Sequence, residues 1–331
     1  MLNVNRLNPI FSIIITCYKV EKYIRDVIDS VIKNGETDKL EIILVDDGSP
    51  DNCGKIIDAF SREYSFIKTV HQENRGPGGA RNSGLREACG EYVFFLDGDD
   101  RMAEGVLHKV YNVITINPIC DIITSNKHYY TNWEKSYVRE TDLKLDLLNQ
   151  KELRLRLAQD TYLAHSFYKR KMLIDSNKPF SEGRKLGEDQ HWILNNVAFA
   201  KNIEVLDIGF YYHYEKRPGS QVNGFSDDMR IETLELMCKI YRDTDILPYS
   251  SEEMDVLKHG ASCLFMGSGA GIFVDCYDKE IQRQAKIILN NNRDILECRQ
   301  NKWRFLMKLG RIIGIRNALI LYWKLKMNRR K

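Results

Sequence analysis

The fold is decided by the stretch Tyr92-Val93-Phe94-Phe95-Leu96-Asp97-Gly98-Asp99-Asp100, in which five strand-forming apolar residues run directly into three carboxylates. A continuous apolar run of this length is typical of a strand that is buried on both faces of a parallel sheet. Carboxylates grouped at its end repel one another and raise each other's pKa. A hard divalent cation such as Mg²⁺ or Mn²⁺ removes that cost and keeps coordination positions open for phosphate oxygens. The alternative is a simple polar turn, because Asp and Gly are common turn residues.

Strand and helix signals alternate in the chain that leads up to this stretch. The expected strands cover residues 11–16, 41–45, 66–71 and 92–96, and the expected helices cover residues 21–33, 53–64 and 80–88. A glycine-rich loop, residues 74–79, is expected before the third helix. This alternation with short connections predicts an α/β fold with a mostly parallel sheet flanked by helices.

Polar residues follow three of the expected strands at the point where each strand ends. They are Thr16 to Tyr18, Asp46-Asp47 and Asp97 to Asp100. Ligands of parallel α/β sheets bind at the carboxyl ends of the strands. We therefore expect these three groups to meet at one edge of the sheet.

The chain after residue 125 is less regular. We expect a hairpin or lid at 128–142, a helix at 151–157, a loop at 181–187, a helix at 190–200 and a strand at 203–208. From about Ser226 the sequence reads as helical, with no convincing strand. These signals predict an α/β domain over residues 1–225 and a helical region over 226–331, with the boundary near Phe225.

Composition is that of a soluble globular protein. The 331 residues contain no apolar run long enough for a membrane span and no signal-peptide pattern at the N-terminus. The eight cysteines show no CxxC pair and no zinc-like spacing, so we expect reduced and mostly buried thiols in the cytoplasm.

Positive charge is concentrated at the C-terminus. Residues 302–331 contain ten Lys or Arg and no acid, so removing this tail from the net +3 leaves a body of −7. A nucleic-acid binder usually carries its basic surface on the folded domain, so this charge distribution argues against that class. Apolar residues among the cations predict amphipathic helices that bind an anionic membrane surface. The alternative is a helix that docks on the body or on the partner of a homo-oligomer. The membrane interpretation predicts that the body stays soluble when the tail is removed.

Five segments together resemble family 2 glycosyltransferases, which are nucleotide-sugar enzymes of the GT-A fold. The segments are Ser12-Ile13-Ile14-Ile15-Thr16-Cys17-Tyr18, Val45-Asp46-Asp47-Gly48-Ser49, Asn74-x-Gly76 with Ala80-Arg81-Asn82-x-Gly84, Phe95-Leu96-Asp97-Gly98-Asp99-Asp100, and Gly187-Glu188-Asp189. They occur in the family's order over residues 11–225, and the sequence looks most like bacterial enzymes that build capsule, exopolysaccharide or teichoic acid. Two positions depart from the family pattern, because Thr16 and Lys19 stand where Pro and Asn are usual.

The resemblance implies a nucleotide site at the strand ends. It places Thr16, Tyr18, Asp46, Asp47 and Arg81 around the nucleotide. A carboxylate at Asp46 or Asp47 suits the N3–H of uracil, while a turn in which it accepts backbone N–H bonds is the alternative. Tyr18 is expected to stack on the base or to lie in the core. Arg81, at a helix N-terminus, is expected to contact the diphosphate or the edge of a base, and a surface salt bridge is the alternative.

The resemblance also assigns the acidic residues. Asp97 is expected to reach the ribose or sugar and to join Asp99 in binding Mn²⁺ or Mg²⁺, with Asp100 behind them. Asp189 is the expected catalytic base and Glu188 its neighbour, which orients the sugar or acceptor. Helix capping is the alternative for this pair, because acids are common in the first turn of a helix.

Two aromatic and basic features near these acids are less specific. Trp192 is expected either to line the acceptor site or to lie in the core. His213 precedes a candidate lid over the diphosphate, residues 216–220, for which a surface loop is the simpler interpretation.

The resemblance therefore implies an inverting, metal-dependent transferase that moves a sugar to a glycan or lipid-linked acceptor at the inner face of the cell membrane, with a UDP-sugar as the expected donor. Two alternatives remain. A sugar nucleotidyltransferase would carry its glycine-rich motif directly after the first strand, where this chain has Thr16-Cys17-Tyr18. A catalytically inactive nucleotide-sugar binding protein would lack part of the acidic set, which is complete here.

Overall fold

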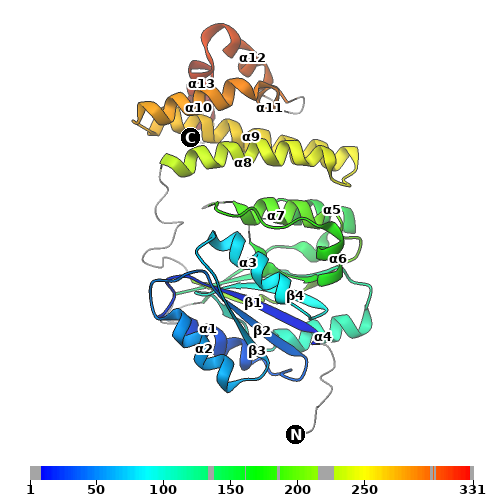
Figure 1. The fold of residues 1–331 in the computed structure, drawn as a ribbon. Helices are drawn as coiled ribbons and strands as arrows, with labels where there is room; N and C mark the ends of the chain where they lie inside the picture. The colour runs from blue at the N-terminus through cyan, green and yellow to red at the C-terminus, as the bar shows by residue number, and fades with distance from the viewer. Residues whose placement is uncertain are drawn as a thin grey trace. The chain divides into compact units, whose positions relative to one another are not determined.

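A computed structural model of the chain describes residues 9–132, 138–160, 162–184, 187–214, 227–298, 301 and 303–328 (Figure 1). The chain forms two compact units. The α/β unit comprises Met1–Arg184 and Glu188–Pro218, and the helical unit comprises Lys185–Gly187 and Gly219–Lys331. The boundary expected near Phe225 and the expected lid at 216–220 lie outside the described residues, so both stay predictions.

A seven-stranded sheet forms the centre of the α/β unit, in the order β10-β6-β9-β4-β1-β2-β3. Its strands are β1 (Phe11–Cys17), β2 (Leu40–Asp46), β3 (Ile67–His71), β4 (Tyr92–Asp97), β6 (Ile122–Ser125), β9 (Ser166–Lys169) and β10 (Ile203–Leu206). All neighbouring strands are parallel except where β9 pairs with β4 and β6. The expected mostly parallel sheet is confirmed, and the antiparallel β9 is an element that the sequence did not reveal.

Helices cover both faces of this sheet. They are α1 (Ile24–Ile32), α2 (Cys53–Glu63), α3 (Gly76–Glu87), α4 (Val106–Ile116), α5 (Gln150–Leu157), α6 (Arg170–Ser176) and α7 (Glu188–Val197). Alternate residues of β1 show the two layers. Ile13 and Ile15 belong to the core that includes α1, α2 and α4, whereas Ile14 points toward α3, where a Cβ on Gly84 would come within 2.3 Å of it.

A second sheet of four strands has the order β5-β11-β7-β8. It contains β5 (Arg101–Met102), β7 (Lys127–Thr131), β8 (Val138–Asp142) and β11 (Tyr211–Tyr214). β7 and β8 pair in antiparallel register, which confirms a hairpin in the 128–142 segment. β11 follows β10, the last strand of the large sheet, and lies beside the acidic loop that follows β4.

The expected glycine-rich loop is wrong, because α3 already begins at Gly76. Pro77 occupies the first turn of the helix, where its fixed φ is favourable and its missing N–H has no intrahelical acceptor. The glycines serve close packing in that turn. A Cβ on Gly78 would lie 2.4 Å from the backbone oxygen of Ser181, and one on Gly79 would lie 2.5 Å from Cβ of Arg75.

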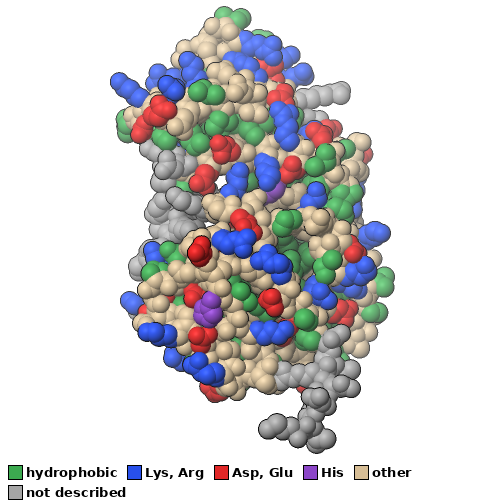
Figure 2. Space-filling model, in the orientation of Figure 1, with side chains coloured by type: hydrophobic (Ala, Val, Ile, Leu, Met, Phe, Trp, Pro, Cys, Tyr) green, Lys and Arg blue, Asp and Glu red, His purple; other side chains and the backbone are tan. Residues whose placement is uncertain are grey.

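The helical unit contains α8 (Asp227–Asp243), α9 (Ser251–Asp275), α10 (Lys279–Asn291), α11 (Arg293–Leu296), α12 (Arg304–Ile313) and α13 (Ile315–Asn328). This agrees with the helical character expected from about residue 226. Among the helices that the described residues form, none has both the length and the apolar character required to cross a bilayer. Figure 2 shows Lys and Arg interspersed with Asp and Glu on the visible face of the molecule.

Candidate active site

The carboxyl ends of three adjacent strands bring the expected site residues together. β1 lies between β2 and β4, and the register places Cys17 beside Asp46 and Thr16 beside Asp97. The backbone N–H of Asp47 donates to the carbonyl of Cys17 at 3.1 Å. The two acidic groups therefore occupy one edge of the sheet on either side of the end of β1, as the sequence predicted.

Two glycines allow the chain to turn at this edge. Gly48 has φ +65°, and a Cβ there would lie 2.9 Å from the backbone nitrogen of Asn74. A Cβ on Gly98 would lie 2.5 Å from the carbonyl oxygen of Thr16. Only glycine fits these two positions without displacing a neighbouring backbone segment.

The carboxylates at the end of β2 hold the loops around them. Oδ1 of Asp46 accepts a hydrogen bond from a backbone N–H of the following turn at 2.9 Å, and its Oδ2 lies 3.2 Å from Nδ1 of His71. Oδ1 of the buried Asp47 accepts from Nε2 of Gln72 and from the backbone N–H of Arg75. The turn-stabilising role is thus present in Asp46, whereas Asp47 holds the segment that follows β3, and contact of either residue with a nucleobase stays a prediction.

The three acids of the loop after β4 differ in how exposed they are to solvent. The side chain of Asp97 is 49% exposed and Asp99 is partly exposed, whereas Asp100 is buried. Asp100 accepts a hydrogen bond from the backbone N–H of Tyr214 at 3.0 Å and lies 3.3 Å from Nδ1 of His213. Asp100 therefore ties the loop to β11, which leaves Asp97 and Asp99 as the accessible acids.

His213 was not recognised from the sequence as a partner of this loop. Burial disfavours its charged form, but the hydrogen bond to Asp100 and the negative charges of Asp100, Asp97 and Asp99 outweigh that effect and raise the pKa of His213 to about 9. The pKa of Asp100 is raised by burial, against the effect of His213.

Arg81 is the centre of the site. It lies in the second turn of α3 with its side chain 5% exposed, not at the N-terminus of the helix. Nη2 donates to Oδ1 of Asp97 at 2.8 Å, and Nη1 donates to Oδ1 of Asp189 at 2.5 Å and to Oε1 of Glu188 at 3.1 Å. Burial alone would lower the pKa of Arg81, but Asp189, Asp97 and Glu188 together raise it above its ordinary value. The surface salt bridge considered for Arg81 is therefore wrong, because its guanidinium is buried together with Glu188.

Glu188 and Asp189 lie in the first turn of α7, where the sequence placed them. Glu188 is buried and the side chain of Asp189 is 24% exposed, so Asp189 is the member of the pair that a bound molecule can reach. Burial raises the pKa of Asp189 well above its usual range, Arg81 opposes this, and the charges of Glu188 and Asp97 add to it. A carboxylate with a raised pKa is a stronger base than an ordinary aspartate.

Three other predicted residues can be placed. Tyr18 is 38% exposed just past β1, so its core interpretation is wrong, and Thr16 is partly buried. Trp192 is 1% exposed and stacks on Phe180 with ring centroids 4.5 Å apart, which makes it a core residue and not part of an acceptor site.

The ligand set for a divalent cation is incomplete by itself. Among the residues that the structure describes, His, Cys, Asp and Glu side chains do not form a group of three or more able to hold a metal ion. The site nevertheless fits a hard cation. Arg81 supplies one positive charge against the three carboxylates it contacts, and Asp97 and Asp99 offer accessible oxygen donors beside them.

Comparisons with known proteins agree with this architecture. The sequence matches the model of glycosyl transferase family 2 over residues 12–176. The uncharacterized glycosyltransferase EpsJ of Bacillus subtilis is 31% identical over 218 residues, which are 64% of this chain and 62% of EpsJ. The poly(ribitol-phosphate) β-N-acetylglucosaminyltransferase TarS of Staphylococcus aureus is 27% identical over 69% of this chain and 40% of TarS.

A solved structure resembles the whole described fold. The crystal structure of residues 1–349 of S. aureus TarS in complex with UDP-GlcNAc has a TM-score of 0.78 at 22% identity, and it covers 96% of this chain and 92% of that one. This likeness shows that the two chains share a fold. The matched relatives are longer than the region of similarity, since the chain spans 62% of the length of EpsJ and less of TarS.

Proposed function

The α/β unit of this chain belongs to glycosyl transferase family 2, and from this premise we propose that the protein transfers a sugar from a nucleotide sugar to a glycan or lipid-linked acceptor during cell-surface polysaccharide synthesis. The donor is a UDP-sugar in this proposal. The name of TarS, and its structure with UDP-GlcNAc, support that choice of donor class and of acceptor class.

One observation carries the proposal. A single guanidinium, that of Arg81, contacts Asp97 at the end of β4 and Asp189 at the start of α7. These two acids are the residues assigned to the donor and to the acceptor hydroxyl. Because Arg81 is buried and charged, it fixes the spacing of the two carboxylates, so a donor held at Asp97 lies close to an acceptor hydroxyl at Asp189.

The proposed reaction is a direct displacement at the anomeric carbon. The acceptor hydroxyl oxygen forms the new bond to that carbon from the side opposite the diphosphate, and the bond to the diphosphate oxygen breaks, so the configuration inverts. Asp189 accepts the proton of the hydroxyl, and the nucleoside diphosphate leaves with the electron pair. The raised pKa of Asp189 favours this proton transfer, while Glu188, held on the same guanidinium, orients the sugar or acceptor.

Asp97 and Asp99 would hold Mn²⁺ or Mg²⁺. When bound, such a cation would supply neutralisation of the negative charge on the departing diphosphate. On the nucleotide side, Tyr18 offers an exposed ring for stacking on the base. Asp46 and Asp47 lie at the end of β2, next to the end of β1 and at the same edge of the sheet. A carboxylate oxygen of this pair that is not already hydrogen-bonded can accept the N3–H of uracil.

The rival nucleotidyltransferase assignment is disfavoured by the position of the glycines. Gly76, Gly78 and Gly79 lie inside the first turn of α3, where Gly78 and Gly79 pack against neighbouring residues. They do not form the phosphate-binding loop directly after β1 that this alternative requires.

A panel of UDP-, GDP- and dTDP-sugars tests the proposal by thermal shift with Mn²⁺ and with EDTA. A ligand at 100 times its dissociation constant stabilises a protein by about 2.7 kcal/mol, which corresponds to several degrees in this size range. We expect a UDP-sugar to give such a shift with Mn²⁺, and to release UDP when acceptor or water attacks. Failure of every nucleotide sugar to shift the melting temperature contradicts the proposal. Binding without any release by wild type supports an inactive binding protein instead.

We further propose that α12 attaches the protein peripherally to the inner face of the cell membrane. The exposed face of this helix combines Phe305, 81% exposed, and Ile312, 82% exposed, with the cations Arg304 and Lys308. Apolar side chains flanked by cations bind anionic bilayers by insertion and by charge.

The remaining tail is not the detachable segment that the sequence suggested. Leu319 and Tyr322 of α13 are buried within the helical unit, and a Cβ on Gly269 of α9 would lie 3.3 Å from Leu319. Point substitution is therefore a better test than truncation. Phe305→Ser with Ile312→Ser should reduce binding to vesicles that contain phosphatidylglycerol.

A matched control comes from the α/β unit. Ile116 and Ile119 are 84% and 64% exposed, so Ile116→Ser with Ile119→Ser changes apolar exposure without changing α12. Vesicle binding should be unchanged in this control. Equal binding by the α12 double variant and wild type would refute membrane attachment through α12.

A further inference from the structure

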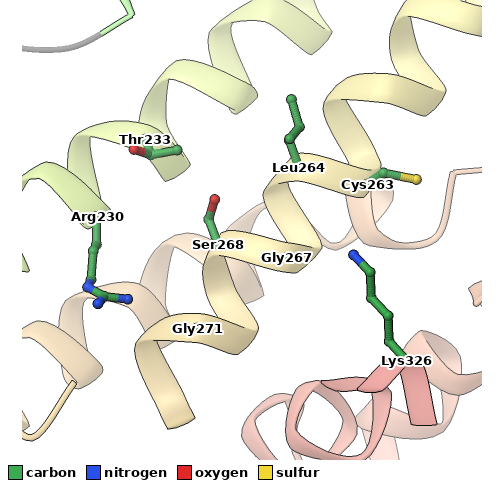
Figure 3. Close-up of a pocket in the computed structure, with 8 residues that line it drawn as sticks. All are labelled: Arg230, Thr233, Cys263, Leu264, Gly267, Ser268, Gly271 and Lys326. Atoms are coloured by element: carbon green, nitrogen blue, oxygen red, sulfur yellow. The ribbon is translucent and has the colours of Figure 1, made fainter. Parts of the chain in front are cut away.

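The helical unit contains a cavity of about 280 Å³ whose charged lining residues are both cations (Figure 3). Its walls are formed by α8, α9 and α13. The lining residues are Arg230, Thr233, Cys263, Leu264, Gly267, Ser268, Gly271 and Lys326. A volume near the lower end of the range for small-molecule pockets suits a ligand with few heavy atoms.

Gly267 keeps the floor of this cavity open. A Cβ built on Gly267 meets nothing within 4 Å, whereas one on Gly269, two residues along α9, would lie 2.9 Å from Leu289. Gly269 thus permits close helix packing, and Gly267 does not. A glycine inside a helix costs about 1 kcal/mol relative to alanine. At Gly267 no close contact in the described structure compensates for that cost, and the missing side chain leaves open space.

Two cations reach this space from different helices. In Figure 3 the side chain of Arg230 extends from α8 and that of Lys326 extends from α13, toward the cavity from its two ends. The guanidinium lies beside α9, since a Cβ built on Gly271 would be in ordinary van der Waals contact with Nη1 of Arg230, at 3.5 Å. Like charges that line one cavity favour an anion between them.

Hydroxyl groups and apolar atoms complete the lining. Thr233 donates its hydroxyl hydrogen to the carbonyl of Met229 at 2.8 Å, so its oxygen can still accept, and Ser268 has no hydrogen-bond partner among the described residues. Leu264 is 50% exposed and supplies an apolar wall. The lining therefore offers two cationic donors and the hydroxyl donor of Ser268 for an anion, and apolar surface for the carbon atoms attached to it.

We propose that this cavity binds the phosphate group of a small phosphate ester, with the phosphate between Arg230 and Lys326 and the ester carbons toward Leu264. Phosphate suits these groups because its oxygens accept hydrogen bonds from a guanidinium, an ammonium and a hydroxyl at the same time. The ester is either a soluble polyol phosphate or the headgroup of a phospholipid, and both present the same chemistry to the cavity.

Titration calorimetry with glycerol 1-phosphate tests the soluble form. Sedimentation with phosphatidylglycerol or phosphatidylcholine vesicles tests the lipid, with every protein carrying Phe305→Ser and Ile312→Ser so that attachment through α12 does not contribute. Each of Arg230→Met and Lys326→Met should weaken binding about tenfold or more, as expected for the loss of a charged hydrogen bond of at least about 1.4 kcal/mol. The control Lys324→Met removes an exposed cation of the same helix that does not line the cavity, and it should leave binding unchanged.

A second pair of variants separates cavity filling from charge. Gly267→Met should block binding. The matched control Gly260→Met, at another α9 glycine whose Cβ would meet nothing within 4 Å, should not block it. Circular dichroism checks that both variants stay folded. The assays use no nucleotide sugar, so their failure leaves the proposed sugar transfer untouched.

The outcomes decide the proposal. If glycerol 1-phosphate binds and Gly267→Met abolishes that binding, the ligand is a soluble phosphate ester. If only phosphatidylglycerol vesicles bind, and Gly267→Met abolishes that binding, the ligand is a phospholipid headgroup. The proposal is overturned if neither probe binds, if succinate binds as tightly as glycerol 1-phosphate, or if Gly267→Met and Gly260→Met bind alike.

Discussion

Replacing Arg81 by methionine is the most informative perturbation of the site. Methionine keeps much of the side-chain volume but removes the only positive charge that the hydrogen bonds place between Asp97, Glu188 and Asp189. Breaking a buried ion pair by removing one partner typically costs about 3–5 kcal/mol, because a buried charge is left uncompensated. Asp97 is half exposed and screened by water, so it adds little to this cost.

The destabilisation should also depend on pH. Without the guanidinium, which lowers it, the already raised pKa of Asp189 rises further in the folded state. This carboxyl is then protonated at low pH and must be ionised, at a cost, as the pH increases. The loss of stability in Arg81→Met should therefore be close to about 3 kcal/mol near pH 8 and clearly smaller near pH 5.5.

Urea unfolding at both pH values measures this difference. Arg75→Met is the matched control, because Arg75 lies beside the same helix and donates to Glu182 at 2.6 Å, but both side chains are largely exposed. An exposed pair contributes at most about 1 kcal/mol. If Arg81→Met costs no more than Arg75→Met, or costs the same at both pH values, the buried network does not hold the two carboxylates as described.

Three further predictions concern packing and catalysis. Gly84→Ala should lower the free energy of unfolding by about 1–3 kcal/mol, because its Cβ would lie 2.3 Å from Cγ2 of Ile14, and unchanged urea unfolding would contradict this packing. Gly260→Ala should raise stability by up to about 1 kcal/mol, since nothing lies within 4 Å of the new methyl group, and a lower melting temperature would count against this. The rate of sugar transfer should rise with pH through the raised pKa of Asp189, because only the ionised carboxylate accepts a proton. A rate that does not change between about pH 5 and pH 8 would exclude Asp189 as the base.

The strands that carry the site could be predicted because their signals are local. β1, β2 and β4 are apolar runs, and the last two end in carboxylates, so their burial and their shared edge follow from the sequence. The start of α3 could not be predicted by the same logic. Its glycines resemble a loop, and the contacts that explain them, such as the one between Gly78 and Ser181, join residues about one hundred positions apart.

The role of Arg81 was hidden for the same reason. Two of its three carboxylate partners follow it by 107 and 108 residues, and no periodicity or motif in one sequence reports such a pairing. β9 escaped notice because it is only four residues long and inserts antiparallel between β4 and β6. Residue types were therefore informative about which groups form the site, but not about how buried charges are paired within it.

The central claim is that Asp189 takes part in sugar transfer but not in holding the donor. It is tested most directly by measuring, on one preparation of Asp189→Asn, both the dissociation constant for the UDP-sugar and the rate of UDP release. Asp175→Asn, a change of an exposed acid on α6, serves as the control. We predict a donor affinity close to that of wild type with at least about a hundredfold loss of rate. Wild-type turnover in Asp189→Asn would contradict the account.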